Sequence, residues 1–326
     1  MTDFKTISGR KIKFQTSDLT MSTATEGELF YSDTDSEFKI GIQVKAWSSG
    51  GNLNTTRNAL SGTGTLTAGL VAGGTSPGTA FETAGEEYDG SSWTNGGAIN
   101  TGRKLAATQG TQTAGIHTGG IKAPANTNTG ETETYDGSSW TEVGDLNTAR
   151  YGLGGAGTST AAVAFGGNEI GGSMQVASEE WAGSSWAEGD NLNTARHYLA
   201  ACGTQTAALC IGGSPPDLAV VESYDGSSWT EGPDLNTARS GLKAAGITTA
   251  ALAFGGYAGT AYTGATEEYD GTSWTETSDM ATGRVEHGEG KAGTTSATFA
   301  AGGESPRTNV TEEWTSASTK RSVDTS

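Results

Sequence analysis

The feature that most constrains this chain is an internal repeat of about 45 residues, present in six copies. An LNTAR-like string ends each time at an arginine, and we number repeats 1 to 6 by these residues: Arg57, Arg103, Arg150, Arg196, Arg239 and Arg284. A Gly-Gly pair follows 16 or 18 residues later, and a YDGSSW-like string ends at Trp93, Trp140, Trp186, Trp229 and Trp274. One unit of this size cannot bury both faces of a sheet, so the copies must stack on each other.

Each repeat predicts four short β-strands, which we call a, b, c and d. Strand a follows the arginine, and strand b carries alternating apolar residues such as Leu252 and Phe254 before the Gly pair. Strand c ends in Glu-x-Tyr-Asp, and strand d begins at Ser-Trp. A two-residue turn with Gly226 at its first central position places Tyr224 opposite Trp229. The same register predicts five aromatic pairs: Tyr88 with Trp93, Tyr135 with Trp140, Trp181 with Trp186, Tyr224 with Trp229, and Tyr269 with Trp274.

Composition supports an all-β chain. Gly contributes 51 of the 326 residues, and Gly, Ser, Thr and Asn all disfavour helices. The 8 Trp, 9 Tyr and 8 Phe residues are enough to supply a core, so a folded chain is favoured over a disordered one. No apolar run is long enough to span a membrane, and the polar start lacks the apolar segment of a secretory leader, so we expect no membrane insertion and synthesis in the cytoplasm. Cys202 and Cys210 are offset across a turn that places a residue near 207 opposite Cys202, so we expect no disulfide.

Three features together resemble the Kelch repeat: the arginine before strand a, the Gly pair after strand b, and Tyr-Asp followed by Trp across the turn between strands c and d. The resemblance covers residues 42–317. It implies a six-bladed β-propeller with four antiparallel strands in each blade. The interval from Tyr to Trp is five residues, shorter than in typical Kelch blades, which predicts a tighter hairpin.

The two ends of the repeat region predict how such a ring closes. Repeat 6 reaches Trp314 without a following strand d, and Trp47 precedes repeat 1 without a strand c of its own. We therefore expect residues 42–47 to supply strand d of the last blade, which brings Trp47 and Trp314 together and leaves no open sheet edge. This interpretation divides the chain into an arm and hairpin (1–41), a propeller (42–317) and a disordered tail (318–326).

Length differences among the repeats fall almost entirely in the connections between strands b and c. The strings TSPGTAFETAG, IKAPANTNTG and YAGTAYTGAT have little in common. In a propeller these connections emerge on one rim, and insertions within repeats usually lie on the binding face. Two interpretations stay open, a contact surface for a partner and neutral drift in exposed loops.

The repeat arginines have a matching set of acids. A glutamate stands two residues before the strand c aromatic in every repeat, at Glu86, Glu133, Glu179, Glu222, Glu267 and Glu312. Equal numbers favour one structural ion pair in each blade, with the arginines around one mouth of the central channel. The alternative is a ring of arginines that binds an anion.

Enzymatic interpretations are weaker. His117, His197 and His287 stand in different repeats, and no zinc or copper spacing appears, so neither a metal site nor a galactose-oxidase-like copper site is predicted. The string SYDGSSW is one residue short of the Asp-box of sialidases, and Ser227 has no His and Asp partners that would make it a nucleophile. Residues 33–37 lack the Gly and the later Glu of a calcium loop, which favours a hairpin turn. We therefore predict a protein that is not an enzyme and uses no cofactor.

Charge and the first 41 residues indicate the partners. The chain has 37 acidic against 19 basic residues, a formal charge of −18, which disfavours nucleic acid. Residues 29–31 and 38–40 predict a hairpin that is too small to fold alone and must rest on the propeller or on another protein. The string GELFYSDTDSEFKI resembles the hairpin modules at the attachment end of tailed-phage fibre and appendage proteins. With the Gly-, Ser-, Thr- and Asn-rich blades, it is similar to Kelch-like virion proteins of marine bacteriophages.

These resemblances imply a structural protein of the virion, either a capsid decoration or a tail or fibre adhesin. Residues 1–41 would attach it to other virion proteins, and the connections between strands b and c would bind a protein or glycan of the host surface. Two alternatives stay open. One is a cytoplasmic Kelch module for protein interaction, and the other is a propeller that binds or processes glycans.

Overall fold

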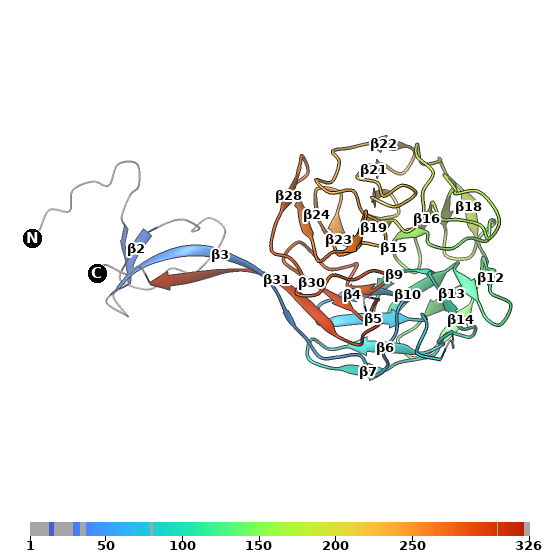
Figure 1. Cartoon of the computed structure of the whole chain (residues 1–326), viewed down its shortest axis with the longest axis horizontal. Helices are drawn as coiled ribbons and strands as arrows, with labels where there is room; N and C mark the ends of the chain where they lie inside the picture. Colours follow the sequence, from blue (N-terminus) through green and yellow to red (C-terminus); the bar gives the residue numbers. More distant parts are fainter. Residues whose placement is uncertain (1–12, 16–28, 33–36, 79–80, 305, 323–326) are drawn as a thin grey trace, which may run out of the picture. The chain divides into compact units, whose positions relative to one another are not determined.

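The computed structural model describes residues 13–15, 29–32, 37–78, 81–304 and 306–322, which form β-strands joined by turns (Figure 1). The all-β prediction is confirmed for these residues. Because they contain no helix, none of them provides a helix that could cross a membrane. The chain divides into two compact units, Trp47–Trp314 and Met1–Ala46 with Thr315–Ser326. The boundary falls within two long strands, β3 (Glu37–Ser49) and β31 (Thr311–Ser322).

The larger unit contains one antiparallel sheet for each repeat, in which strands a to d are consecutive neighbours, and two smaller sheets that are described below. Repeat 1 forms β4 (Ser61–Thr65), β5 (Ala68–Ala72), β6 (Gly85–Tyr88) and β7 (Trp93–Asn95). Repeat 2 forms β9 (Ala107–Thr111), β10 (Ala114–Thr118), β13 (Thr132–Tyr135) and β14 (Trp140–Glu142). Repeat 3 forms β15 (Gly154–Gly157), β16 (Ala162–Phe165), β17 (Ser178–Trp181) and β18 (Trp186–Glu188).

The remaining repeats follow the same order. Repeat 4 forms β19 (Ala200–Thr204), β20 (Ala207–Ile211), β21 (Val221–Tyr224) and β22 (Trp229–Glu231). Repeat 5 forms β23 (Lys243–Ile247), β24 (Ala250–Phe254), β27 (Thr266–Tyr269) and β28 (Trp274–Glu276). Repeat 6 contributes β29 (Gly288–Glu289), β30 (Ala297–Ala301) and β31, and its fourth neighbour is β3 from the start of the chain.

The sheets of the larger unit are arranged around a common centre, with the strands a innermost, which is a propeller-like arrangement (Figure 1). Hydrogen bonds join neighbouring repeats, because the amide of the second glycine in each Gly pair donates to the carbonyl of the next repeat's arginine. The six bonds are Gly74 to Arg103, Gly120 to Arg150, Gly167 to Arg196, Gly213 to Arg239, Gly256 to Arg284, and Gly303 to Arg57, each 2.9 Å long. The last of them joins repeat 6 to repeat 1.

The Gly pair is required by this close approach. Gly73 and Gly74 have φ values of 67° and 97°, which side chains disfavour, and a Cβ on Gly73 would lie 2.5 Å from the carbonyl oxygen of Arg103. A larger residue would therefore separate repeat 1 from repeat 2.

The core lies between repeats rather than within one sheet. Successive side chains of strand b point to opposite faces of the sheet. In repeat 5, Ala251 and Ala253 therefore pack in a cluster with repeat 4, whereas Leu252 and Phe254 pack with repeat 6. Each buried cluster in the described part of the chain joins two repeats in this way. One of them joins repeat 6 to repeat 1 through Phe299, which lies edge-on to Trp93 at 5.4 Å between ring centroids. Stacking therefore buries both faces of each sheet, as the repeat length predicts.

The c–d pairing follows the predicted register. Each strand c aromatic is opposite the strand d tryptophan in all five pairs, with ring centroids 4.7 to 5.4 Å apart. The turn glycine Gly226 has a φ of 91°, as its predicted position requires.

Trp47 and Trp314 lie together, with ring centroids 5.6 Å apart. The indole of Trp47 donates to Thr266 of repeat 5 at 3.0 Å. The indoles of Trp93, Trp186 and Trp229 donate in the same way to the residue at the equivalent position of the preceding repeat, at Thr311, Thr132 and Ser178. Trp47 thus occupies the place of a strand d tryptophan beside strand c of repeat 6.

Two sequence expectations differ from the structure. Residues 318–322 belong to β31 and are not the disordered tail expected from the end of the repeat, because β31 continues as a neighbour of β3. Residues 323–326 lie outside the described residues. The residue opposite Cys202 is Leu209, not one near 207, and Cys210 is opposite Ala201, so both buried cysteines are free, as expected from their offset.

The smaller unit contains the predicted hairpin. β2 (Leu29–Ser32) pairs antiparallel with β3, with Tyr31 opposite Phe38, and β1 (Lys13–Gln15) pairs parallel with β2. The turn predicted at residues 33–36 and most of the predicted arm lie outside the described residues.

Candidate functional site

The six arginines lie beside the six glutamates that the spacing indicates. Arginine and glutamate side chains are at most 4% exposed in every pair. The shortest nitrogen to oxygen distances are Arg57–Glu86 2.9 Å, Arg103–Glu133 3.0 Å, Arg150–Glu179 3.2 Å, Arg196–Glu222 2.7 Å and Arg239–Glu267 2.8 Å, and Arg284 pairs with Glu312 in the same way. Each repeat therefore contains one buried ion pair of this recurring Arg–Glu kind.

Backbone groups around each pair accept from the arginine, although the Nε of each of the six arginines is buried without a hydrogen-bond partner among the described residues. Arg57 also donates to the carbonyls of Gly73 and Ala84, and the second carboxylate oxygen of Glu86 accepts from the amide of Asn54 at 2.7 Å. Burial lowers the pKa of the Arg57 guanidinium, and the charge of Glu86 opposes that change. Because the arginines are buried and paired, they cannot form the anion-binding ring considered above, nor do their side chains line a channel mouth.

The residues that do surround the centre stand two positions after each arginine. All six have a left-handed backbone, with φ between 54° and 63°: Ala59, Leu105, Gly152, Tyr198, Gly241 and Glu286. Their amides and carbonyls form a chain of bonds from repeat to repeat, such as Leu105 N to Ala59 O at 2.9 Å. Four of the six are not glycine, and each such residue costs about 1–2 kcal/mol in this conformation, which the surrounding bonds must offset.

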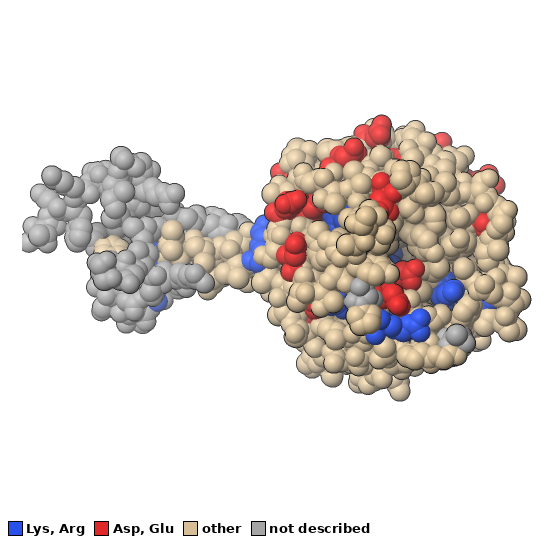
Figure 2. All heavy atoms as spheres, viewed as in Figure 1, with Lys and Arg blue, Asp and Glu red and all other residues tan. Residues whose placement is uncertain are grey.

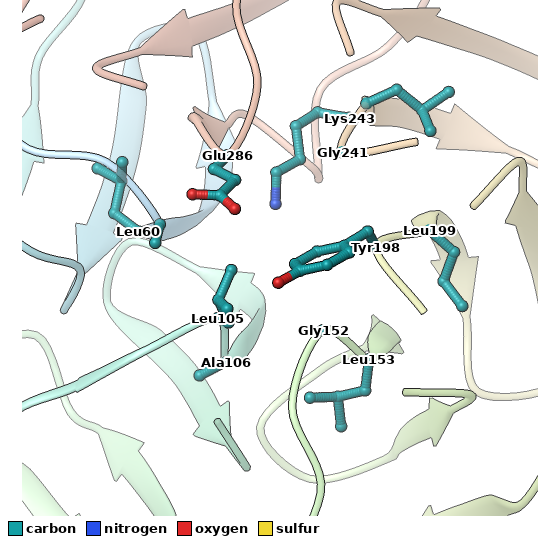
Figure 3. Close-up of a pocket in the computed structure, with 12 residues that line it drawn as sticks. Leu60, Leu105, Ala106, Gly152, Leu153, Tyr198, Leu199, Gly241, Lys243 and Glu286 are labelled. Carbon is teal, nitrogen blue, oxygen red and sulfur yellow. The ribbon is translucent and has the colours of Figure 1, made fainter. Parts of the chain in front are cut away.

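A cavity of about 30 Å³ lies inside this chain of residues, and all six repeats line it. Tyr198, Lys243 and Glu286 extend toward one another there, whereas the other residues that line the cavity are Ala, Leu and Gly (Figure 3). The Glu286 carboxylate accepts from the side-chain amide of Asn58 at 3.2 Å, and burial raises its pKa while Lys243 acts against that change. This volume has room for about two water molecules, so the cavity is too small for an organic substrate.

Strand a of repeat 6 fills the centre further. Where other repeats carry small residues, this strand carries Glu289 and the turn after it carries Lys291, and the charged groups of the two side chains are 3.3 Å apart. The Lys291 ammonium also donates to the carbonyl of Thr108 in repeat 2 at 2.9 Å, and Lys243 lies 3.5 Å from Glu289. Burial lowers the pKa of Lys291, and Glu289 opposes that shift. This buried cluster joins repeats 2, 5 and 6 through the centre.

The histidines show no catalytic arrangement. His117 is buried and its Nδ1 lies 2.7 Å from the hydroxyl of Thr108, and burial holds the pKa of both His117 and His287 well below the ordinary value. The Nδ1 of His197 lies 3.1 Å from the carbonyl of Ser214 in the same repeat. Among the described residues, no three His, Cys, Asp or Glu side chains gather as a metal site would need. Ser227 donates to Asp225 within its turn.

The turns between strands c and d have a feature that sequence reasoning missed. The Asp136 carboxylate accepts from the amides of Ser138 and Ser139, both at 2.8 Å. Asp89, Asp225 and Asp270 do the same in their repeats, whereas repeat 3 has Ala182 at this position. The bonds from Ser139 and Ser138 lower the pKa of Asp136 to about 2. The recurring D-G-S-S string was the available signal, because Asp before Gly-Ser commonly forms such side-chain turns.

The connections between strands b and c form the most open candidate surface. In repeat 2 the connection forms β11 (Ile121–Lys122) and β12 (Thr127–Asn128), and β11 also pairs with β8 (Arg103–Lys104), which precedes strand a. In repeat 5 the connection forms a hairpin of β25 (Tyr257–Ala258) and β26 (Ala261–Tyr262). A groove of about 730 Å³ lies between the connections of repeats 4 and 5, lined by Pro215, Pro216, Asp217 and Gly259 among others. Asp217 holds the two connections together, because it accepts from Ser240 at 2.7 Å and from the amide of Gly259 at 2.8 Å.

Exposed side chains on this rim are varied, and they include Ile170 and Tyr262 at 49% and 44% exposure. On the face that Figure 2 shows, acidic side chains are spread over much of the larger unit and basic ones are fewer. No known family model matches the chain, and no curated protein matches it. The function must therefore be argued from the site itself.

Proposed function

We propose that the larger unit is a six-bladed Kelch-type β-propeller closed by β3, and that it is displayed on a bacteriophage particle as a non-enzymatic binding protein. The hydrogen bond from Gly303 to Arg57 and the place of Trp47 beside strand c of repeat 6 support the ring. The small central cavity and the paired state of the buried arginines support a role other than catalysis.

One observation carries the binding role. The framework of ion pairs and aromatic pairs repeats from blade to blade, while the b–c connections differ in length and sequence and enclose a groove of about 730 Å³. A constant scaffold with variable loops on one rim is the arrangement by which proteins present binding surfaces. The partner is a protein or glycan of the host surface.

The division into two units supports the attachment role. Among its described residues, the smaller unit has two short strands, β1 and β2, beside β3 and β31, which is too little sheet to fold on its own, so a second protein surface is its natural support. We propose that residues 1–41 bind other proteins of the particle, as a capsid decoration or as part of a tail or fibre.

Two measurements test this function. Mass spectrometry of purified particles should detect the chain, and a variant lacking residues 1–30 should be lost from them while its propeller stays folded. The replacement of the 213–220 connection by Gly-Ser linkers should abolish binding to host cells and leave incorporation intact. Absence of the chain from particles would instead favour a cytoplasmic Kelch interaction module.

A further inference from the structure

Neighbouring repeats share a polar contact at the c–d side of their interface. At three interfaces the hydroxyl of the strand c tyrosine donates to a glutamate of the preceding repeat. Tyr135 donates to Glu87 at 2.5 Å, Tyr224 donates to Glu180 at 2.5 Å, and Tyr88 donates to Glu313. Each glutamate stands immediately before the strand c aromatic of its own repeat. Residue spacing within one repeat gives no signal for this contact, because the tyrosine and the glutamate belong to different repeats.

A glycine three residues after the strand d tryptophan completes this contact. A Cβ on Gly96 would lie 3.1 Å from the Tyr135 hydroxyl and 3.2 Å from the Glu87 side chain. A Cβ on Gly189 would lie 3.5 Å from both the Tyr224 hydroxyl and Glu180. The glutamate and the tyrosine therefore fill the space that the glycine leaves.

The interface between repeats 4 and 5 lacks this filling. Ser223 stands in the place of the glutamate, and the Tyr269 hydroxyl has no hydrogen-bond partner within the described part of the chain. A Cβ on Gly232 would meet only the carbonyl oxygen of Val221, at 3.8 Å. A cavity of about 460 Å³ opens at this point, lined by Ser223, Tyr269, Gly232, Thr206, Thr248 and Asp225 among others.

The two other interfaces do not need an acceptor. Repeat 3 has Trp181 where the tyrosine would stand, and Val143 packs against its cluster in place of the glycine. Repeat 6 has Trp314, whose indole donates to the carbonyl of Thr295. Within the described residues, the interface of repeats 4 and 5 thus differs from the other five, because its tyrosine hydroxyl faces a cavity and no glutamate accepts from it.

We propose that this cavity binds a neutral sugar ring, a hexopyranose unit of a glycan. Its lining offers the hydroxyls of Tyr269, Ser223 and Thr248, and a sugar hydroxyl can both accept from Tyr269 and donate to Ser223. The Asp225 carboxylate lines the cavity, and no Lys or Arg is among the described residues that do, so a ligand carboxylate would be repelled. The volume lies within the range of small-molecule sites.

The site is separate from the groove at the b–c connections. It lies at the a–b and c–d turns, which antiparallel strands place at the opposite end of each sheet from the b–c connections. The proposal does not depend on the virion role, so its failure would leave that function standing.

The test is saturation-transfer NMR on the full chain, with the methyl glycosides of glucose, galactose and mannose and with acetate as probes. At least one glycoside should bind and acetate should not. Ser223→Glu restores the residue of the filled interfaces and should abolish binding while raising the melting temperature. Tyr269→Phe should weaken binding about tenfold, the value of one hydrogen bond. The matched control is Tyr135→Phe, which removes the same hydroxyl at a filled interface and should leave binding unchanged.

Gly232→Val gives a second way to fill the cavity, because the equivalent residue of repeat 2 is Val143. It should also abolish binding, which keeps the test decisive if the glutamate variant does not fold. Three results would overturn the proposal: no glycoside binds, binding survives both cavity-filling variants, or acetate binds in place of the sugars.

Discussion

Repeats 5 and 6 contain the same four-strand sheet with different chain connections. In repeat 5 strands a to d follow one another, whereas in repeat 6 strand d comes from β3 at the other end of the chain. The ion pairs Arg239–Glu267 and Arg284–Glu312 are nevertheless equivalent. Strand d is therefore placed by its contacts with strand c and the preceding repeat, and the c–d turn is not needed to place it.

The largest expected effect is the loss of a buried arginine. Arg239→Met and Arg284→Met should each lower the free energy of unfolding by about 3–5 kcal/mol, because each leaves a buried glutamate without its partner. Similar losses of unfolding free energy in urea denaturation would show that repeat 6, whose strand d is β3, is as well formed as repeat 5. A much smaller loss for Arg284→Met would show that the two ion pairs are not equivalent.

Two controls separate charge from packing. The double variant Arg239→Met with Glu267→Met should recover most of the lost stability, because neither charge stays buried alone. Arg307→Met removes a partly exposed arginine that lies 3.5 Å from Glu304, and should change stability by less than about 1 kcal/mol.

The next effect concerns the strand d tryptophans. Trp274→Ala should cost about 3–5 kcal/mol, because the ring is 5% exposed and packs between repeats 4 and 5. Trp47→Ala should cost somewhat less, about 2–3 kcal/mol, because Trp47 is only partly buried, although it contacts Phe254 and Trp314. Urea denaturation measures both, and no loss for Trp47→Ala would contradict its role in repeat 6.

Sequence spacing predicts the features that repeat within one unit. The Arg–Glu pairs and the Tyr–Trp register follow because those residues recur at fixed intervals in every copy. The chain of left-handed residues could not be predicted, because Ala59, Tyr198 and Glu286 share a backbone conformation and no side-chain chemistry. The Glu87–Tyr135 contact joins two repeats, so a single copy carries no signal for it. The extension of β31 to Ser322 depends on its neighbour β3, which no local pattern encodes.

The smallest effect concerns the c–d turn, which repeat 5 has and repeat 6 lacks. The pKa of Asp136 falls from 3.8 to about 2 on folding, so its stabilising effect is present above pH 3.8 and is lost as the pH falls toward 2. Asp136→Ala should therefore lower the melting temperature at pH 6 and not at pH 2. Ala182→Asp adds the missing carboxylate to repeat 3 and should raise the melting temperature at pH 6 alone. Equal shifts of the melting temperature at both pH values would show that the ionised carboxylate does not stabilise the turn.

The most direct test of the account is hydrogen exchange at strand d of repeats 5 and 6, followed by mass spectrometry. The amide of Gly50 donates to the carbonyl of Thr311 at 3.0 Å, so it should exchange only when the whole larger unit opens. The account predicts that peptides covering residues 47–50 are as strongly protected as those covering 274–277. Exchange of residues 47–50 at the rate of a free chain would contradict it.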